Sequence, residues 1–293
     1  MMQSAVDKAA ALVEAHEYIR RFEGKTIVVK VGGSIMDEPE NLKSVIADIC
    51  FMDAVGMRPV VVHGGGKSIT QAMQQAGLQA QFVQGQRYTD ERTLAIAEHV
   101  LVNEVNKTLV DWINALEHKG MGLHSLGSCV VFGKRLFLPA QDDPKRKLDI
   151  GFVGEVESVN ASLIKALIEA DYIPVIAPIA GDSAGGKLNV NADIVAGHVA
   201  AALKAEKLVL VSDTHGIRTG RGADSLASSL TKHQIQALVE QGIITAGMLP
   251  KVEASFIALA GGVAKTHIVD GGIPHAALLE VYTNEGIGTE IVL

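Results

Sequence analysis

Short runs of aliphatic and β-branched residues, each followed by a stretch with helical spacing, recur along the whole chain. The clearest of these runs are residues 26–31, 59–63, 173–177, 208–212 and 266–270. Their apolar character is continuous rather than alternating, which is typical of parallel strands that are buried on both faces. Helical patterns such as 192–204 and 250–259 lie between them. We therefore expect an α/β protein, a three-layer αβα sandwich around a mainly parallel, open sheet.

Two stretches break this rhythm and indicate how the chain is divided. Residues 129–138 and 152–159 have the character of strands, and a charged segment rather than a helix joins them, which predicts a β-rich insert or hairpin. The Gly/Asp/Ser-rich segment 180–187 is typical of a junction between lobes. We expect three parts: an N-terminal helix at 1–24, an N-terminal lobe at 25–180 and a C-terminal lobe at 181–293.

The composition excludes several classes of function. The 293 residues carry a formal net charge of −7 with no long run of Lys or Arg, so the broad basic face of a nucleic-acid binder is missing. No uncharged apolar stretch approaches the ~20 residues of a membrane-spanning helix, and no Cys/His cluster has the spacing of a zinc site. The two cysteines, Cys50 and Cys129, and an N-terminus unlike a signal or transit peptide predict a cytoplasmic protein.

Glycines follow the first two predicted strands directly. Lys30 closes the first strand in VVKVGGS, and His63 closes the second in VVVHGGGKS. Glycine lets backbone N–H groups approach an anion closely, and the start of the next helix adds the positive end of its dipole. Two such turns at neighbouring strand ends predict a phosphate cradle. A Walker P-loop is excluded because G-x-x-x-x-G-K-[ST] requires glycine where Val61 stands.

Two lysines stand where a cation is unfavourable. Lys30 lies in an otherwise apolar strand, where an ammonium is costly unless it faces a site or a partner. Lys251 follows Pro250 at the start of a predicted helix, where a cation opposes the helix dipole. Lys30 is therefore a candidate site residue. Lys251 is either held there for an external anion or is an ordinary solvated helix residue.

Polar residues in two further motifs have alternative interpretations. Asn189 and Asn191 of LNVNAD are two residues apart on an extended segment, so both could donate to a substrate carboxylate or amide. Asn191 and Asp193 precede or begin a helix, and these residue types routinely cap helices. Arg87, in QGQRYTD, is either a surface arginine or a bidentate clamp for a carboxylate.

Together these segments resemble the amino acid kinase family, and within it the acetylglutamate kinases. The matching segments cover most of the chain and include GKTIVVKVGGSIM, VVVHGGGKSI, FVQGQRYTD, GFVGEVESVN, LNVNADIVAGHVAAALKAEKLVLVSD and HIVDGGIPHAALLEVYTNEGIGT. The resemblance implies that the N-terminal lobe binds the acylamino acid and dimerises while the C-terminal lobe binds ATP. It also implies transfer of the γ-phosphoryl group of ATP to the side-chain carboxylate of N-acetyl-L-glutamate, in arginine biosynthesis. Mg²⁺ should arrive on the nucleotide, because no cluster of carboxylates suggests a protein cage.

The resemblance also implies a role for each matching residue. Lys30 and Lys251 match the lysines that neutralise the transferring phosphoryl group, and Asp193 matches the carboxylate that orients both. The other matches are Gly32 and Gly33 on the nucleotide phosphates, Gly65, Gly66, Arg87, Asn189 and Asn191 around the acylamino acid, and Ser212 and Asp213 at the start of the nucleotide pocket.

Both ends of the chain resemble regulated members of the family. Residues 1–22 have the spacing of an amphipathic helix, and with the following FEGK they resemble an extension that links dimers into arginine-inhibited hexamers. The segment 280–289 resembles the arginine site, with Glu280 and Gly286 as candidates, although Gly272 stands where the family usually has arginine. We expect a homo-oligomer, dimer or hexamer, with arginine as feedback inhibitor. The alternatives are a related kinase for another carboxylate and a non-catalytic arginine sensor of the same fold.

Overall fold

The computed structural model describes residues 2–125, 127–140, 142–220, 222, 225–244, 247–282 and 286–293, with the backbone alone at 2–9, 11 and 12. The helices are α1 (Met2–Phe22), α2 (Gly33–Met36), α3 (Pro39–Ala54), α4 (Gly66–Gln75), α5 (Glu91–His99), the π-helix η1 (Val100–Asn106), α6 (Lys107–Ala115), α7 (Ala161–Glu169), α8 (Ala192–Leu203), α9 (Lys232–Glu240), α10 (Leu249–Ala260) and α11 (Ala276–Tyr282). The strands are β1 (Thr26–Val31), β2 (Arg58–His63), β3 (Phe82–Val83), β4 (Gln86–Arg87), β5 (Gly120–Leu123), β6 (Val131–Pro139), β7 (Lys147–Val159), β8 (Ile173–Ile176), β9 (Ile179–Gly181), β10 (Lys187–Asn189), β11 (Lys207–Ser212), β12 (Ser229–Thr231), β13 (Lys265–Asp270) and β14 (Thr289–Val292).

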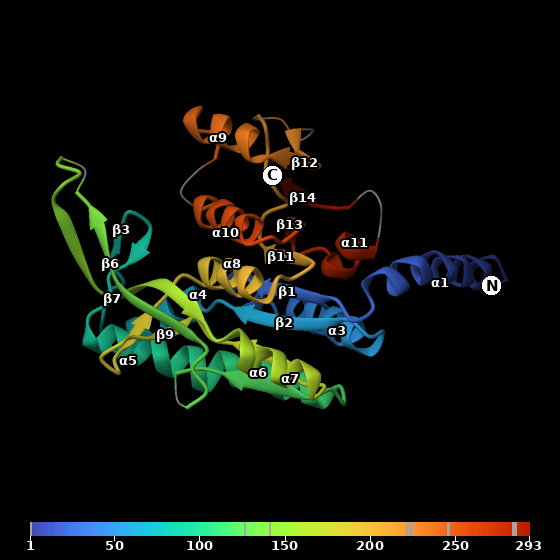
Figure 1. Cartoon of the computed structure of the whole chain (residues 1–293), viewed down its shortest axis with the longest axis horizontal. Coiled ribbons are helices and arrows are strands. Elements are labelled where there is room, and N and C mark those ends of the chain that lie inside the picture. Colours follow the sequence, from blue (N-terminus) through green and yellow to red (C-terminus); the bar gives the residue numbers. More distant parts are fainter. Residues whose placement is uncertain are drawn as a thin grey trace.

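An eight-stranded sheet runs through the molecule in the order β12-β14-β13-β11-β1-β2-β8-β5 (Figure 1). Every neighbouring pair is parallel except β13 and β14. The five strands predicted from apolar runs are all present in it. Because Val31 pairs with both His63 and Val211, the carboxyl ends of β1, β2 and β11 meet at one edge. In open parallel sheets this edge is where ligands bind.

Helices cover both faces of this sheet, so the predicted three-layer αβα sandwich is confirmed. Ile27, Val29 and Val31 of β1 join a buried cluster with α3, η1, α6 and α11 on one face. Val28 joins a second buried cluster with α7, α8 and α10 on the other. Alternate residues of a strand point to opposite faces, and Lys30 therefore lies on the same face as Val28, toward α8.

The predicted hairpin is also present, and it belongs to a second, smaller sheet. Strands β6 and β7 pair antiparallel, and with β9 and β10 they form a four-stranded sheet that closes on itself. β7 begins at Lys147, earlier than the predicted strand at 152. The segment 180–187, predicted as a junction, forms the turn between antiparallel β9 and β10. The boundary between lobes at 180 and 181 stays a prediction.

The N-terminal helix extends away from the body of the molecule (Figure 1). Its last turn packs on α11, where the rings of Tyr18 and Tyr282 meet edge to face at a centroid distance of 6.4 Å and Phe22 is buried. Farther toward the N-terminus, Val13 is 73% exposed. In the described part of the chain, no helix combines the length and apolar character needed to cross a membrane.

Candidate active site

The glycine turns after β1 and β2 lie against each other at the carboxyl edge of the sheet. The N–H of Gly64 donates to the carbonyl oxygen of Val31 at 2.9 Å. A Cβ added to Gly33 would lie 3.3 Å from the backbone nitrogen of Gly66 and 3.4 Å from that of Gly65. A side chain at position 33 would therefore crowd these two N–H groups. The structure thus brings the two turns together into one concave group of backbone donors.

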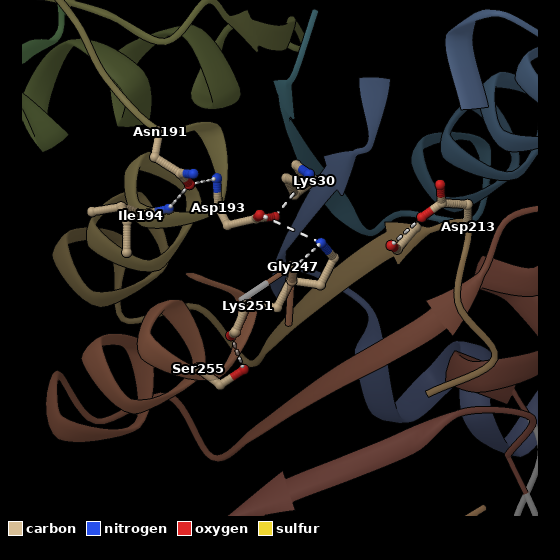
Figure 2. Close-up of polar contacts among 9 residues, drawn as sticks. Lys30, Asn191, Asp193, Ile194, Asp213, Gly247, Lys251 and Ser255 are labelled. Atoms are coloured by element: carbon tan, nitrogen blue, oxygen red, sulfur yellow. Dashed lines mark hydrogen bonds and ion pairs between the residues drawn. The ribbon is translucent and has the colours of Figure 1, made fainter. Parts of the chain in front are cut away.

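Two lysines and one carboxylate converge beside this turn pair (Figure 2). Lys30 comes from β1, Asp193 from the first turn of α8 and Lys251 from the first turn of α10. Lys30 Nζ lies 2.8 Å from Asp193 Oδ1, and Lys251 Nζ lies 3.7 Å from Asp193 Oδ2. Only 6% of Lys30 and 6% of Asp193 is exposed. The solvated alternative for Lys251 is wrong, because its side chain turns inward to this cluster.

The charge of the cluster is set by the shared carboxylate. Burial alone raises the pKa of Asp193, but the charges and hydrogen bonds of Lys30 and Lys251 oppose it and hold the pKa below its usual value. Asp193 is therefore ionised at neutral pH. One carboxylate between two ammonium groups leaves one net positive charge, so the cluster can accept an anion while the lysines remain close together.

A cavity of about 230 Å³ opens next to Lys30 and Asp193. Apolar side chains form part of its wall, and polar groups from distant segments form the rest. The apolar residues include Ile69, Phe82, Leu101, Val153, Pro178, Val190 and Ala192, and the polar ones include Arg87, Asn189 and Asn191. The structure thus places all three predicted acylamino-acid side chains on one cavity, beside Gly65 and Gly66.

Arg87 is not a surface arginine, so that alternative is excluded. The residue is 9% exposed, and its Nη2 donates to the carbonyl oxygen of Gly66 and to Thr70 Oγ1, both at 2.8 Å. Its guanidinium also lies 4.9 Å from the centre of the Phe82 ring. Burial lowers the pKa of Arg87 below its usual value. Its Nη1 donates to Met73 Sδ at 3.3 Å. The group remains a cation at neutral pH, and Nε–H and the second hydrogen of Nη1 are left to meet a carboxylate.

The two asparagines are held in different ways. Asn191 caps α8, since its Oδ1 accepts from the N–H groups of Asp193 at 2.9 Å and Ile194 at 3.2 Å (Figure 2). Capping uses only the oxygen of the amide, which leaves its N–H groups for a ligand. Asn189 Nδ2 donates to Thr89 Oγ1 at 3.2 Å. Thr89, fully buried, was not singled out from the sequence, although it belongs to the same RYTD motif as Arg87.

The nucleotide candidates lie at the end of β11. Gly32 donates its N–H to the carbonyl oxygen of Val211 at 2.9 Å, which ties the first glycine turn to this strand. Ser212 Oγ donates to Asp213 Oδ1 at 3.3 Å. In the view of Figure 2, Asp213 lies on the other side of Lys251 from Asn191. The residues that follow Asp213 in the sequence line a cavity of about 290 Å³. Its lining is Thr214, His215, Gly216, Ile217, Arg218, Ile243, Ile244 and Met248.

The model of the amino acid kinase family matches residues 25–270 of this sequence. This chain belongs to the amino acid kinase family. Among its relatives, the acetylglutamate kinase of Moorella thermoacetica is 47% identical over 294 residues, covering 100% of this chain and 99% of that protein. The acetylglutamate kinase of Geobacter sp. is 44% identical over 292 residues, covering 99% of each.

Solved structures place this amino acid kinase among proteins of the same fold. N-acetylglutamate synthase from Neisseria gonorrhoeae, complexed with coenzyme A and N-acetyl-glutamate, has a TM-score of 0.85 at 24% identity, covering 97% of this chain and 63% of that one. The smu.665 structure from Streptococcus mutans has a TM-score of 0.73 at 27% identity, covering 91% and 98%. Within the described residues of this amino acid kinase, no group of three or more His, Cys, Asp or Glu side chains is arranged to hold a metal ion.

The amino acid kinase has a second polar cavity, of about 330 Å³, between the end of α1 and the C-terminal tail. Its lining includes both candidates for the arginine site, Glu280 and Gly286. Glu280 is buried: its Oε1 lies 2.6 Å from His267 Nδ1, and its Oε2 accepts from the N–H groups of Ile287 and Gly288. Burial raises the pKa of Glu280, but these hydrogen bonds outweigh it and lower the pKa. Residues 283–285 of the predicted site lie outside the described residues.

Proposed function

We propose that this protein transfers the γ-phosphoryl group of ATP to the side-chain carboxylate of N-acetyl-L-glutamate, a step of arginine biosynthesis. The observation that carries the proposal is the Lys30–Asp193–Lys251 cluster, in which Lys30 and Asp193 line a cavity together with Arg87. Two relatives that share 47% and 44% of its residues over their full lengths are acetylglutamate kinases, which supports the choice of acceptor.

The reaction needs charge neutralisation and alignment rather than a strong base. The attacking carboxylate is already anionic, so an oxygen of the carboxylate attacks the γ-phosphorus, the bond to the bridging oxygen breaks, and ADP leaves without a proton transfer. Lys30 and Lys251 neutralise the charge that spreads over the transferring group, and Asp193 keeps them oriented. Gly33 and Gly65 line the same cavity, and their backbone N–H groups are the proposed donors to that group.

The remaining residues of the site bind the two substrates. Arg87 faces the cavity as a cation and suits the main-chain carboxylate of the acylamino acid, while the free amide N–H groups of Asn189 and Asn191 suit its acyl carbonyl and carboxylate oxygens. Gly32, Ser212 and Asp213 are the residues proposed to contact the nucleotide. Mg²⁺ would arrive bound to ATP and would add neutralising charge beside Lys30 and Lys251.

The acceptor is tested by trapping the acyl phosphate with hydroxylamine, using ATP and Mg²⁺ with N-acetylglutamate, glutamate, aspartate or aminoadipate. We expect strong activity with N-acetylglutamate alone. Activity confined to another of the four acids would reassign the acceptor within the family. No activity with any of the four acids would favour a non-catalytic arginine sensor of the same fold.

We further propose that the protein acts in the cytoplasm. Its N-terminal lobe, 25–180, binds the acylamino acid and dimerises, and its C-terminal lobe, 181–293, binds ATP. The segment 1–24 then links dimers into a hexamer, and arginine binds as inhibitor in the second cavity. Support comes from the lining of that cavity, where the carboxylates of Glu280 and Glu290 stand beside the cations Arg21, Lys207 and Lys265 and so suit a ligand that carries both a cationic and an anionic group. A second structure of the N-acetylglutamate synthase from Neisseria gonorrhoeae, at 23% identity, is complexed with L-arginine.

A further inference from the structure

His63, the last residue of β2, is buried next to the glycine turn and has no task in the reaction described above. Its side chain is 0% exposed, and its Nδ1 lies 2.8 Å from the carbonyl oxygen of Gly64. Because a carbonyl oxygen only accepts, Nδ1 carries the proton and donates. Nε2 then accepts from Asn106 Nδ2 at 3.1 Å. Burial lowers the pKa of His63 to about 4. The ring is therefore neutral at neutral pH and held in one tautomer.

Asn106 is itself fixed on the sheet. Its Nδ2 also donates to the carbonyl oxygen of Val175 in β8 at 2.8 Å, so both amide hydrogens are committed. A Cβ added to Gly122 of β5 would lie 2.3 Å from Asn106 Oδ1, which shows how closely the amide lies against the sheet. A continuous line of hydrogen bonds thus runs from the backbone of β8 through Asn106 and His63 to Gly64.

Asn106 ends η1, and this π-helix contacts the glycine turn at a second point. A Cβ added to Gly65 would lie only 2.6 Å from Leu101 Cδ2, so the Leu101 side chain packs directly against the turn. π-Helical turns are rare and occur frequently at functional sites. Here the wider turn places Leu101 against Gly65 and Asn106 against His63 at the same time.

The geometry of the peptide bond connects His63 to the cavity. In a planar trans peptide the C=O and N–H groups point in opposite directions, and the described chain contains no cis peptide bond. The hydrogen bond from His63 turns the Gly64 carbonyl toward the buried ring. The Gly65 N–H on the same peptide therefore points away from the ring, toward the cavity that Gly65 lines. No acceptor for this N–H is found among the described protein groups.

We propose that His63 and Asn106 are positioning residues that aim the Gly65 N–H at the transferring phosphoryl group. This inference rests on the function proposed above. A donor aimed in advance at developing charge requires no reorganisation during the reaction, and misplacing it by about 1 Å can cost ~10²-fold in rate. Neither residue needs to touch a substrate.

Two replacements of His63 separate its two hydrogen bonds. Asparagine places an amide N–H where Nδ1 stands and can still donate to Gly64, whereas glutamine reaches the Nε2 position and meets Asn106 instead. We expect His63→Gln, which loses the bond to Gly64, to lower kcat by ~10²-fold with little change in either KM. His63→Asn keeps that bond and should retain most of kcat. Asn106→Ala removes the group that holds the imidazole in one tautomer, so it should lower kcat by a smaller factor than His63→Gln. Asn103→Ala, an exposed asparagine of the same π-helix, is the matched control and should behave like the wild type.

The measurements are kcat and KM for both substrates, the thermal midpoint of each variant, and the Kd of Mg·ADP with and without aluminium fluoride, which mimics the transferring group. We expect His63→Gln to bind Mg·ADP normally and to lose the tightening by fluoride. Any of three results would overturn the positioning role. The first is an equal kcat in His63→Gln and His63→Asn, and the second is an equal kcat in Asn106→Ala and Asn103→Ala. The third is a normal tightening of Mg·ADP binding by fluoride in His63→Gln. The fluoride experiment needs no acceptor, so a wild-type chain inactive on N-acetylglutamate would reject the proposed acceptor alone.

Discussion

At the scale of single residues, the position of Lys30 makes a direct prediction. Its ammonium is buried, and its partner carboxylate, Asp193, is shared with Lys251. A cation held against the transferring group stabilises the transition state more than it stabilises the bound substrates. We expect Lys30→Ala to lower kcat by at least ~10²-fold with a much smaller change in KM, measured by steady-state kinetics.

The control for Lys30 is the lysine of the GGGKS motif. Lys67 has a side chain that is 65% exposed and pairs with Asp37 at 3.1 Å, outside the cavity. Lys67→Ala should therefore keep the wild-type kcat. Loss of turnover in Lys67→Ala but not in Lys30→Ala would mean that the motif works like a P-loop and that the proposed mechanism is wrong.

The lowered pKa of Asp193 predicts how stability depends on pH. A carboxyl whose pKa is depressed in the folded state contributes stability above its unfolded value, here 3.8, and loses it as the pH falls through the folded value. The free energy of unfolding of the wild type should therefore exceed that of Asp193→Asn at neutral pH. The difference should shrink below pH 3.8 in denaturant titrations. A constant difference across this range would contradict the ion-pair assignment.

At the scale of elements, the N-terminus of α8 contributes both to the stability of the helix and to the candidate site. Asn191 caps the helix through its oxygen and lines the cavity. We expect Asn191→Ala to lower the free energy of unfolding by about 1 kcal/mol. We also expect a higher KM for the acylamino acid, because the amide donors are lost. Denaturant unfolding and steady-state kinetics on the same preparation measure the two effects.

A second helix cap provides the matched control. Thr231 and Gln234 form a capping box at the start of α9, beside an outer strand of the sheet. Thr231→Ala should cost a similar amount of stability without changing the KM for the acylamino acid. If both cap variants changed this KM equally, the effect of Asn191→Ala would reflect stability alone.

At the scale of the whole molecule, α1 is the part that can be removed with least damage. Among its described side chains, those that pack on the body are in the last turn: Tyr18, Ile19 and Phe22. We expect deletion of residues 1–15 to reduce a hexamer to dimers and to weaken inhibition by arginine while kcat stays unchanged. Light scattering after size-exclusion chromatography and assays with added arginine measure both. An unaltered mass together with an unaltered arginine response would exclude the linker role.

The sequence by itself determined the layers, the main strands and the two glycine turns. A continuous apolar run can be buried only between two covering layers, and glycine after a strand permits a close backbone approach, so both signals are local. The hairpin between β6 and β7 followed from the same local signals. The full order of matching segments was sufficient to indicate the family.

Only the tertiary structure decided what the polar side chains meet. It showed that Arg87 is buried, that Lys251 turns inward, that Asn191 is a cap, and that His63 bonds to Asn106. Each of these facts depends on which strands become neighbours and on which face each residue falls. Residues far apart in the chain meet only after β11, β1, β2 and β8 are ordered side by side, and no local pattern encodes that order.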